Sequence, residues 1–172
     1  MNLNNERLRQ FIENSADLME EHGFPRMAGR VIGALLICLP PHMSHEELAE
    51  QLQASKGSIS MSTQLLMRLD FVERISLPGQ RRHYYRLQKN LWKDFLSKTS
   101  SHIHRERGIV MDGLAALEGE PVEMKRRLIE MLVVSDFVSE EWPGLLSRWE
   151  ARRGELLSKR LTEMAQDAEE GE

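Results

Sequence analysis

The chain has 172 residues, of which 41% are hydrophobic and 29% charged, and this composition places it in the ordinary soluble globular class. Its single cysteine, Cys38, excludes a disulfide framework within one chain, and every apolar run falls short of the ~18 residues that a membrane span needs. The N-terminus is polar and lacks the apolar core of a signal peptide, so we expect a cytoplasmic protein without a membrane partner.

The net charge of −4 is distributed unevenly along the chain. From Ser55 to Lys93 there are eight Lys and Arg residues against two acidic ones, which gives this segment a net charge of +6 and the rest of the chain −10. An acidic body with one basic segment suits a polyanion that approaches from one side. A solvated charged surface is the alternative unless other features mark the same segment.

Two helices are predicted before residue 42. Apolar residues recur at three- and four-residue steps over residues 8–19, which predicts an amphipathic helix that ends near Gly23. Pro25 can begin the next helix in its first turn. The apolar pattern then continues until Pro40-Pro41, where two prolines stop the helix.

The second helix carries two glycines and two arginines whose spacing is informative. Gly29 and Gly33 lie one turn apart, so the backbone of a neighbouring helix can approach closely there. Arg26 and Arg30 share one face of the first turns. Ion pairs within the protein and contacts to phosphate are equally good interpretations of these two arginines.

A pair of short helices is predicted next. Ser44 followed by Glu47 forms a capping box, which starts a helix over the sequence SHEELAEQL. Ser55 caps a second helix over residues 56–69, and Asp70 ends it because aspartate tolerates the left-handed conformation. The apolar face of this second helix is expected to hold Ile59, Ser62, Leu66 and Leu69.

A β-hairpin follows the short helices. The sequence FVERISL alternates apolar and polar residues, Pro78-Gly79 supplies a turn, and RRHYYRL alternates again.

From Asn90 to about Ala168 the pattern is helical, with breaks expected at residues 119–121 and 142–144. These long helices and the first helix carry more apolar positions than one core needs, which predicts a homodimer. The expected interface comprises Leu8, Phe11, Ile12, Leu145, Leu146 and Leu156 or their neighbours.

The order of two short helices and a hairpin with arginines at its tip is that of a winged helix-turn-helix. A helix enters the major groove of DNA only if the side chains near its N-terminal end are small. Lys56 and the free backbone amides at the helix start suit a phosphate, while Gln64 can pair with adenine and Met61 can touch a thymine methyl group. Arg81 and Arg82 suit a narrow minor groove. The predicted DNA-binding set is Ser55, Lys56, Ser58, Ser60, Met61, Thr63, Gln64, Arg81 and Arg82.

Other classes of function are disfavoured by the sequence. His102 and His104 are two residues apart, which on a helix points them to different faces, and no compact cluster of metal ligands accompanies them. There is no glycine-rich phosphate loop, nucleophile elbow or pair of catalytic carboxylates, so we expect no enzyme, no metal and no cofactor. The remaining alternative is a winged helix that binds another protein without sequence-specific DNA binding, for which an apolar recognition helix and a neutral wing would be typical.

Three stretches of the chain resemble the GbsR-like branch of the MarR superfamily of transcription regulators: GFPRMAGRVIGALL, LAEQLQASKGSISMSTQLLMRLDFVERI and LPGQRRHYYRL. The resemblance implies a homodimer that places two recognition helices on successive major grooves of a pseudo-palindromic operator. It also implies that Lys56, Ser58, Ser60, Met61 and Gln64 face DNA. Gln80 and Asp70 depart from the pattern, because related wings often carry an aspartate at the first position and a glycine at the second.

The expected fold is mainly α with a small β-hairpin wing, organised as a winged helix-turn-helix plus a helical dimerisation domain. Residues 1–24 are expected to form an N-terminal dimerisation helix, residues 25–90 the DNA-binding domain, and residues 91–172 the C-terminal dimerisation domain. The function implied is transcriptional regulation, with repression as the expected mode and duplex DNA as the partner. The resemblance also implies a small-molecule effector, which the sequence does not identify; a quaternary ammonium such as choline would need an aromatic cage.

Overall fold

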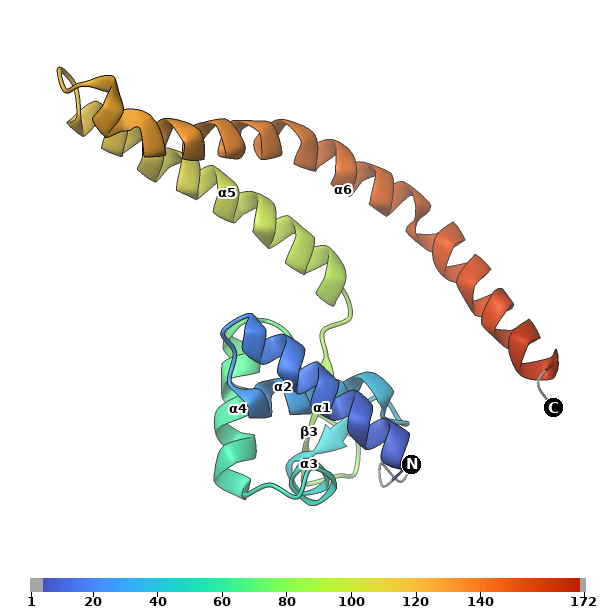
Figure 1. Cartoon of the computed structure of the whole chain (residues 1–172). Coiled ribbons are helices and arrows are strands. Elements are labelled where there is room, and N and C mark those ends of the chain that lie inside the picture. The colour runs from blue at the N-terminus through green and yellow to red at the C-terminus, as the bar shows by residue number, and fades with distance from the viewer. Residues whose placement is uncertain (1–4, 171–172) are drawn as a thin grey trace. The chain divides into compact units, whose positions relative to one another are not determined.

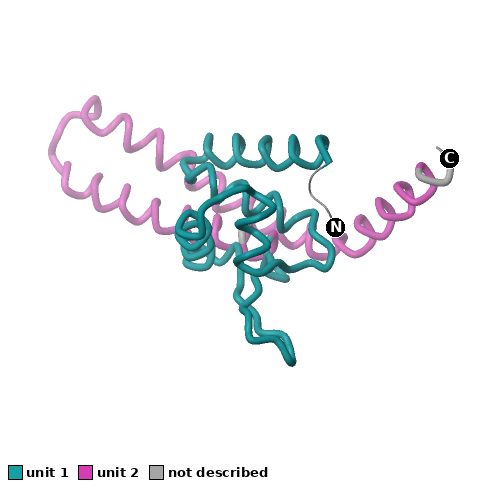
Figure 2. Tube along the Cα trace, turned by 90° about the horizontal axis from the view of Figure 1, so that it is seen from below, with its two compact units in different colours: residues 1–91 teal, residues 92–172 magenta. Residues whose placement is uncertain are grey.

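The structure is a computed structural model that describes residues 5–170, so residues 1–4 and 171–172 of the expected terminal segments lie outside it. The chain divides into two compact units, residues 1–91 and residues 92–172 (Figure 2). The first unit holds α1 (Glu6–Glu21), α2 (Arg26–Ile37), β1 (Met43–Ser44), α3 (His45–Gln51), α4 (Lys56–Arg68), β2 (Val72–Ser76) and β3 (His83–Leu87). The second holds most of α5 (Leu91–Ala116) and all of α6 (Val122–Glu170), as Figure 1 shows.

Helices α1 and α2 pack against each other unusually closely. A Cβ atom added at Gly29 would lie 2.6 Å from Ala16 Cα, and one at Gly33 would lie 3.1 Å from Ile12 Cα. The close approach expected from the two glycines is therefore present, with α1 as the neighbour. Gly23 lies two residues after the end of α1 and has a φ of +81°, a conformation that favours glycine.

The core of the first unit lies between α2, the two short helices and the sheet. Leu48, Leu52, Ile59 and Leu66 are buried there, which confirms the inward faces expected for α3 and α4. Leu69 was expected in the same row but is 41% exposed, so that prediction is wrong. The reason is that α4 already ends at Arg68, and Leu69 lies in the turn that follows it.

The hairpin belongs to a three-stranded antiparallel sheet. Strands β2 and β3 pair from Val72↔Leu87 to Ser76↔His83, which confirms the expected hairpin. Asp70 adopts a φ of +59° before the first strand, as expected. The third strand, β1, pairs with β3 and was not predicted from the sequence.

The second unit is a helical hairpin. Helix α5 ends before a turn in which Gly119 has a φ of +83°, which confirms the first expected break. The second expected break is wrong, because α6 continues through Pro143. Contacts to α5 lie on both sides of the proline: the Trp142 indole N–H donates to the Leu96 carbonyl at 3.0 Å, and Lys93 Nζ lies 2.8 Å from Glu150 Oε1.

Every helix in the described part of the chain is too short or too polar to span a bilayer.

Candidate nucleic-acid interface

Helix α4 is anchored at its start and along one face. The Ser55 hydroxyl accepts a hydrogen bond from the Ser58 amide at 3.2 Å, which satisfies one of the free donors at the helix start, as predicted. Ile59, Ser62 and Leu66 are buried against the rest of the first unit. Because one face is fixed in this way, the opposite face of α4 is presented to solvent.

The exposed face carries most of the residues that the sequence singled out. Ser55, Lys56, Met61 and Gln64 are exposed, while Ser58 and Ser60 are partly exposed. Met61 is 72% exposed, so its side chain is accessible along its length. These residues therefore form one surface on α4 that is free to meet a partner.

Thr63 is the exception and corrects the expectation. It is 1% exposed, and its hydroxyl donates to the carbonyls of Ile59, at 2.9 Å, and Ser60, at 3.2 Å. A buried hydroxyl that already bonds the preceding helical turn cannot reach DNA. Thr63 is therefore part of the structural face of α4.

Two of the exposed polar residues are bonded to each other. The Gln64 side-chain amide donates to the Ser60 hydroxyl at 3.1 Å, one helical turn away. The bond leaves the amide oxygen of Gln64, its second N–H and the hydroxyl hydrogen of Ser60 available. Both groups needed for a bidentate contact to adenine, a donor and an acceptor, are thus present on the free face of α4.

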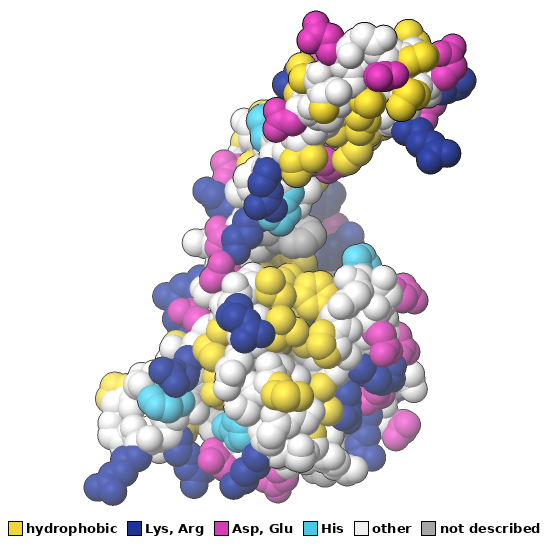
Figure 3. Space-filling model, turned by 90° about the vertical axis from the view of Figure 1, so that its left-hand side faces the viewer, with side chains coloured by type: hydrophobic (Ala, Val, Ile, Leu, Met, Phe, Trp, Pro, Cys, Tyr) yellow, Lys and Arg dark blue, Asp and Glu magenta, His cyan; other side chains and the backbone are white. Residues whose placement is uncertain are grey.

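The wing extends from the first unit as a narrow projection (Figure 2). Arg81 and Arg82 follow its turn and are both exposed, and Figure 3 shows Lys and Arg side chains at the end of a projection from this unit. The Gln80 amide donates to the Leu77 carbonyl at 3.1 Å, and Gly79 has a φ of +73°. The turn is therefore closed by its own backbone.

Other basic residues near the wing divide into paired and unpaired groups. Arg86 Nε donates to Glu73 Oε1 at 2.7 Å across the β2–β3 pair, so its charge is used within the sheet. Arg68, at the end of α4, and Arg74, on β2, are exposed and have no ion-pair partner among the described residues. Both belong to the basic segment but were not predicted as site residues, because their lack of acidic neighbours cannot be seen from the sequence.

Arg26 and Arg30 are used inside the protein, which decides between the two interpretations left open by the sequence. Arg26 bonds to Asp17, and its Nη2 lies 2.8 Å from Glu13 Oε2. The hydrogen bonds that the guanidinium donates to Asp17, Glu13 and Glu20 raise the pKa of Arg26 above its ordinary value. Arg30 Nε lies 2.8 Å from the other oxygen of Glu13. Both arginines therefore join α2 to α1.

No cluster of three metal-ligating side chains occurs within the residues that the structure describes. The arrangement that stands out is instead a helix with a polar exposed face, next to a basic wing. This combination suits duplex DNA, which admits a helix in its major groove and attracts basic side chains to its backbone.

Similar proteins are transcription regulators. A family model described as MmpR5-like MarR family transcriptional regulator matches residues 90–152. The HTH-type transcriptional regulator MmpR5 of Mycobacterium tuberculosis is 33% identical over 148 residues, which are 86% of this chain and 90% of that protein. The HTH-type transcriptional repressor GbsR of Bacillus subtilis is 26% identical over 129 residues, 75% of this chain and 69% of that protein.

Among solved structures, the crystal structure of a transcriptional regulator superimposes with a TM-score of 0.73 at 32% identity, covering 85% of this chain and 99% of that one. The similarity thus extends over the fold and nearly the full length of MmpR5 and of the solved regulator, and it agrees with the GbsR-like resemblance of the sequence. The chain belongs to the MarR family of transcriptional regulators.

Proposed function

We propose that this MarR-family regulator represses transcription by binding a pseudo-palindromic operator as a homodimer, with residues 25–90 on the DNA and residues 1–24 and 91–172 in the dimer. The observation that carries the DNA contact is the exposed face of α4. Lys56, Met61 and Gln64 lie together on it, and no ion pair within the described part of the chain occupies Lys56. Lys56 would contact phosphate, and Met61 and Gln64 would contact base edges.

The test separates base contacts from backbone contacts. Gln64→Ala is expected to weaken binding to the preferred operator by about 1–3 kcal/mol and to leave binding to random DNA nearly unchanged. Lys56→Ala is the matched variant on the same helix face, and it is expected to weaken both duplexes alike because phosphates carry no base identity. Fluorescence anisotropy on operator and random duplexes measures both effects. Equal losses for Gln64→Ala on the two duplexes would refute base recognition by this residue.

The homodimer is supported by the apolar surface of the second unit. Among the described side chains of residues 92–170, only Val110 and Ser135 are buried. Figure 3 shows hydrophobic side chains reaching the surface of this helical hairpin. The exposed large apolar residues of its α6 helix are Val122, Met124, Ile129, Met131, Val133, Val134, Phe137, Leu145, Leu156, Leu157, Leu161 and Met164. Two helices cannot bury such a surface by themselves, so another layer must cover it.

The length of α6 supports a second copy as that layer. Helix α6 has 49 residues against 26 for α5, and the first turn of α5 is already opposite Glu150. The segment 151–167 therefore continues past the start of α5, with Leu157, Leu161 and Met164 exposed at helical spacing. The N-terminal helix offers Phe11 and Leu18, also exposed and two turns apart. Self-association about a twofold axis would cover the apolar face of α6 with the same face of a second copy.

Five of the six residues expected in the interface from sequence are at least partly accessible. Phe11, Leu145 and Leu156 are exposed, and Leu8 and Leu146 are partly exposed. Ile12 is 3% exposed and packs in the core of the first unit, so it cannot serve as an interface residue. Light scattering at micromolar concentration is expected to give twice the chain mass of 19.9 kDa. A particle of 19.9 kDa would refute the dimer.

A further inference from the structure

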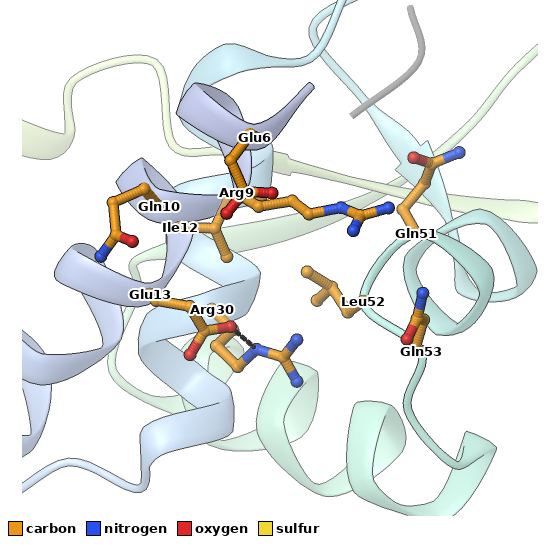
Figure 4. A pocket seen from close by; sticks show the side chains of 9 residues that line it. All are labelled: Glu6, Arg9, Gln10, Ile12, Glu13, Arg30, Gln51, Leu52 and Gln53. Atoms are coloured by element: carbon orange, nitrogen blue, oxygen red, sulfur yellow. Dashed lines mark ion pairs between the residues drawn. The ribbon is translucent and has the colours of Figure 1, made fainter. Parts of the chain in front are cut away.

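A polar cavity of about 270 Å³ lies within the first unit, apart from the DNA-facing surface of α4 (Figure 4). Helix α1 lines it with Glu6, Arg9 and Glu13, and α2 lines it with Arg30. The remaining wall is the end of α3, with Gln51, and the turn that follows it, with Gln53. The volume is just below the range of about 300–1,000 Å³ that is usual for ligand sites, so a small molecule suits it best.

Arg30 presents a guanidinium edge to this cavity. Its Nε lies 2.8 Å from Glu13 Oε1, and Figure 4 shows the rest of the guanidinium extending from that contact into the space beside the turn. Its two Nη atoms have no hydrogen-bond or ion-pair partner among the described residues. The side chain is only 23% exposed, so its position is set by its surroundings. A planar pair of N–H donors held in this way matches a carboxylate.

Glu6 supplies the opposite charge at another point of the same wall. It precedes Glu13 by two helical turns, or about 10 Å along α1, and it has no ion-pair partner within the described chain. The four charged side chains of the lining sum to zero. Each end of the lining holds one cation and one anion, Glu6 with Arg9 at one end and Glu13 with Arg30 at the other, and such a neutral lining favours a ligand that carries both charges over a simple anion.

The floor between these ends is apolar. Ile12 and Leu52 line the cavity and are 3% and 1% exposed. A short chain of methylene groups could lie against them. The lining contains no aromatic side chain, so a flat aromatic ligand would find nothing to stack on.

We propose that this cavity binds a small aliphatic zwitterion, an amino acid whose carboxylate pairs with Arg30 and whose ammonium group pairs with Glu6. The ligand would touch the helix-turn-helix directly. Gln53 lies in the turn with a φ of +48°, two residues before Ser55, the N-cap of the recognition helix. An amino acid bound in the cavity would connect this strained turn to α1 and α2, and so change the affinity of the chain for DNA. This coupling, unlike the site itself, rests on the proposed function.

Isothermal titration of the full chain with unbranched amino acids from glycine to 6-aminohexanoate tests the site. The series varies the distance between the two charges, and acetate and butylamine at matched ionic strength are the single-charge controls. One member of the series is expected to bind at least about tenfold more tightly than either control. Binding by no member, or equal binding by acetate, would overturn the proposal.

Variants identify the two ends of the site. Arg30→Gln and Glu6→Gln are each expected to weaken the best amino acid by about tenfold, and Arg30→Lys, which keeps the charge and loses the paired donors, by less. Arg26→Gln is the matched control, because Arg26 also pairs with Glu13 but does not line the cavity. Circular dichroism establishes that each variant is folded. An Arg26→Gln loss as large as that of Arg30→Gln would show that the arginines act only on the fold.

The same amino acid added to the anisotropy assay tests the coupling. It is expected to shift the affinity for the operator in the wild-type chain and not in Arg30→Gln. Since the titration contains no DNA, it decides the site even if the chain fails to bind an operator. Binding without any shift in DNA affinity would overturn the coupling and leave the site in place.

Discussion

Replacing Gly29 by alanine is expected to push α1 and α2 apart. The added Cβ would lie 2.6 Å from Ala16 Cα, 2.9 Å from Met19 Cβ and 2.9 Å from the Ser15 carbonyl oxygen. Two of these three atoms are backbone, so no side-chain rotation relieves the contact. The helices must separate by several tenths of an ångström along an interface that is otherwise closely packed.

The expected cost follows from two opposing effects. Overpacking a core costs about 1–3 kcal/mol, and a backbone clash belongs at the upper end of that range. Alanine regains about 1 kcal/mol in a helix because it has less conformational freedom than glycine in the unfolded chain. The net loss is therefore about 2 kcal/mol in the free energy of unfolding.

Urea denaturation followed by circular dichroism measures this loss. Gly57→Ala is the matched control in the same unit, because its Cβ would meet only the Ser55 hydroxyl at 4.0 Å. That variant is expected to be as stable as the wild type or slightly more stable. If Gly29→Ala is as stable as Gly57→Ala, the close contact of α1 and α2 does not limit stability and the reasoning fails.

The wing and the cysteine give two further predictions. The double variant Arg81→Ala/Arg82→Ala is expected to weaken binding to every DNA sequence. The slope of log affinity against log salt concentration should fall in magnitude by about 0.9 for each phosphate that the wing no longer neutralises. An unchanged slope and affinity in anisotropy titrations would mean that the wing does not contact the duplex. Burial raises the pKa of the Cys38 thiol, so less thiolate exists at neutral pH and iodoacetamide should label Cys38 more slowly than a free cysteine peptide. Equal labelling rates at neutral pH, or a rate that does not rise as pH passes the ordinary thiol pKa, would contradict that direction.

Local chemistry explains what was predictable in the fold. The capping box is complete, with the Glu47 amide bonded to the Ser44 hydroxyl at 3.2 Å and the Glu47 carboxylate bonded to the Ser44 amide. Such bonds join residues three positions apart, so the sequence contains all the information needed. The positive φ of Asp70 belongs to the same local class.

What could not be predicted depends on contacts between distant residues. Strand β1 has two residues and exists only because Met43 and Ser44 pair with β3 some forty positions later. Helix α6 continues through Pro143, where proline alone predicts a break, and residues on both sides of the proline contact α5. Likewise, the acidic partners of Arg26 lie on a different helix, so its role was undecided in the sequence.

Adjacent residues of α4 in the candidate site differ sharply in exposure. Gln64 is exposed and Thr63 is 1% exposed, although they are adjacent and both polar. Successive helical residues differ by about 100° around the axis. Which of the two residues is buried therefore depends on how α4 is rotated about its axis relative to the core. Composition marked this segment as polar and basic, but only the packing of Ile59 and Leu66 determines which polar residues face outward.

The hydrogen bond between Gln64 and Ser60 makes these two positions interdependent. Side chains in direct contact commonly show coupling energies of about 0.5–3 kcal/mol, so the effect of a change at one position depends on the residue at the other. A library of variants randomised at position 64 alone would contain only side chains whose rotamers are compatible with serine at position 60. New specificities would then be reached through paired substitutions, and a double-mutant cycle on Ser60 and Gln64 measures how strongly the two positions constrain each other.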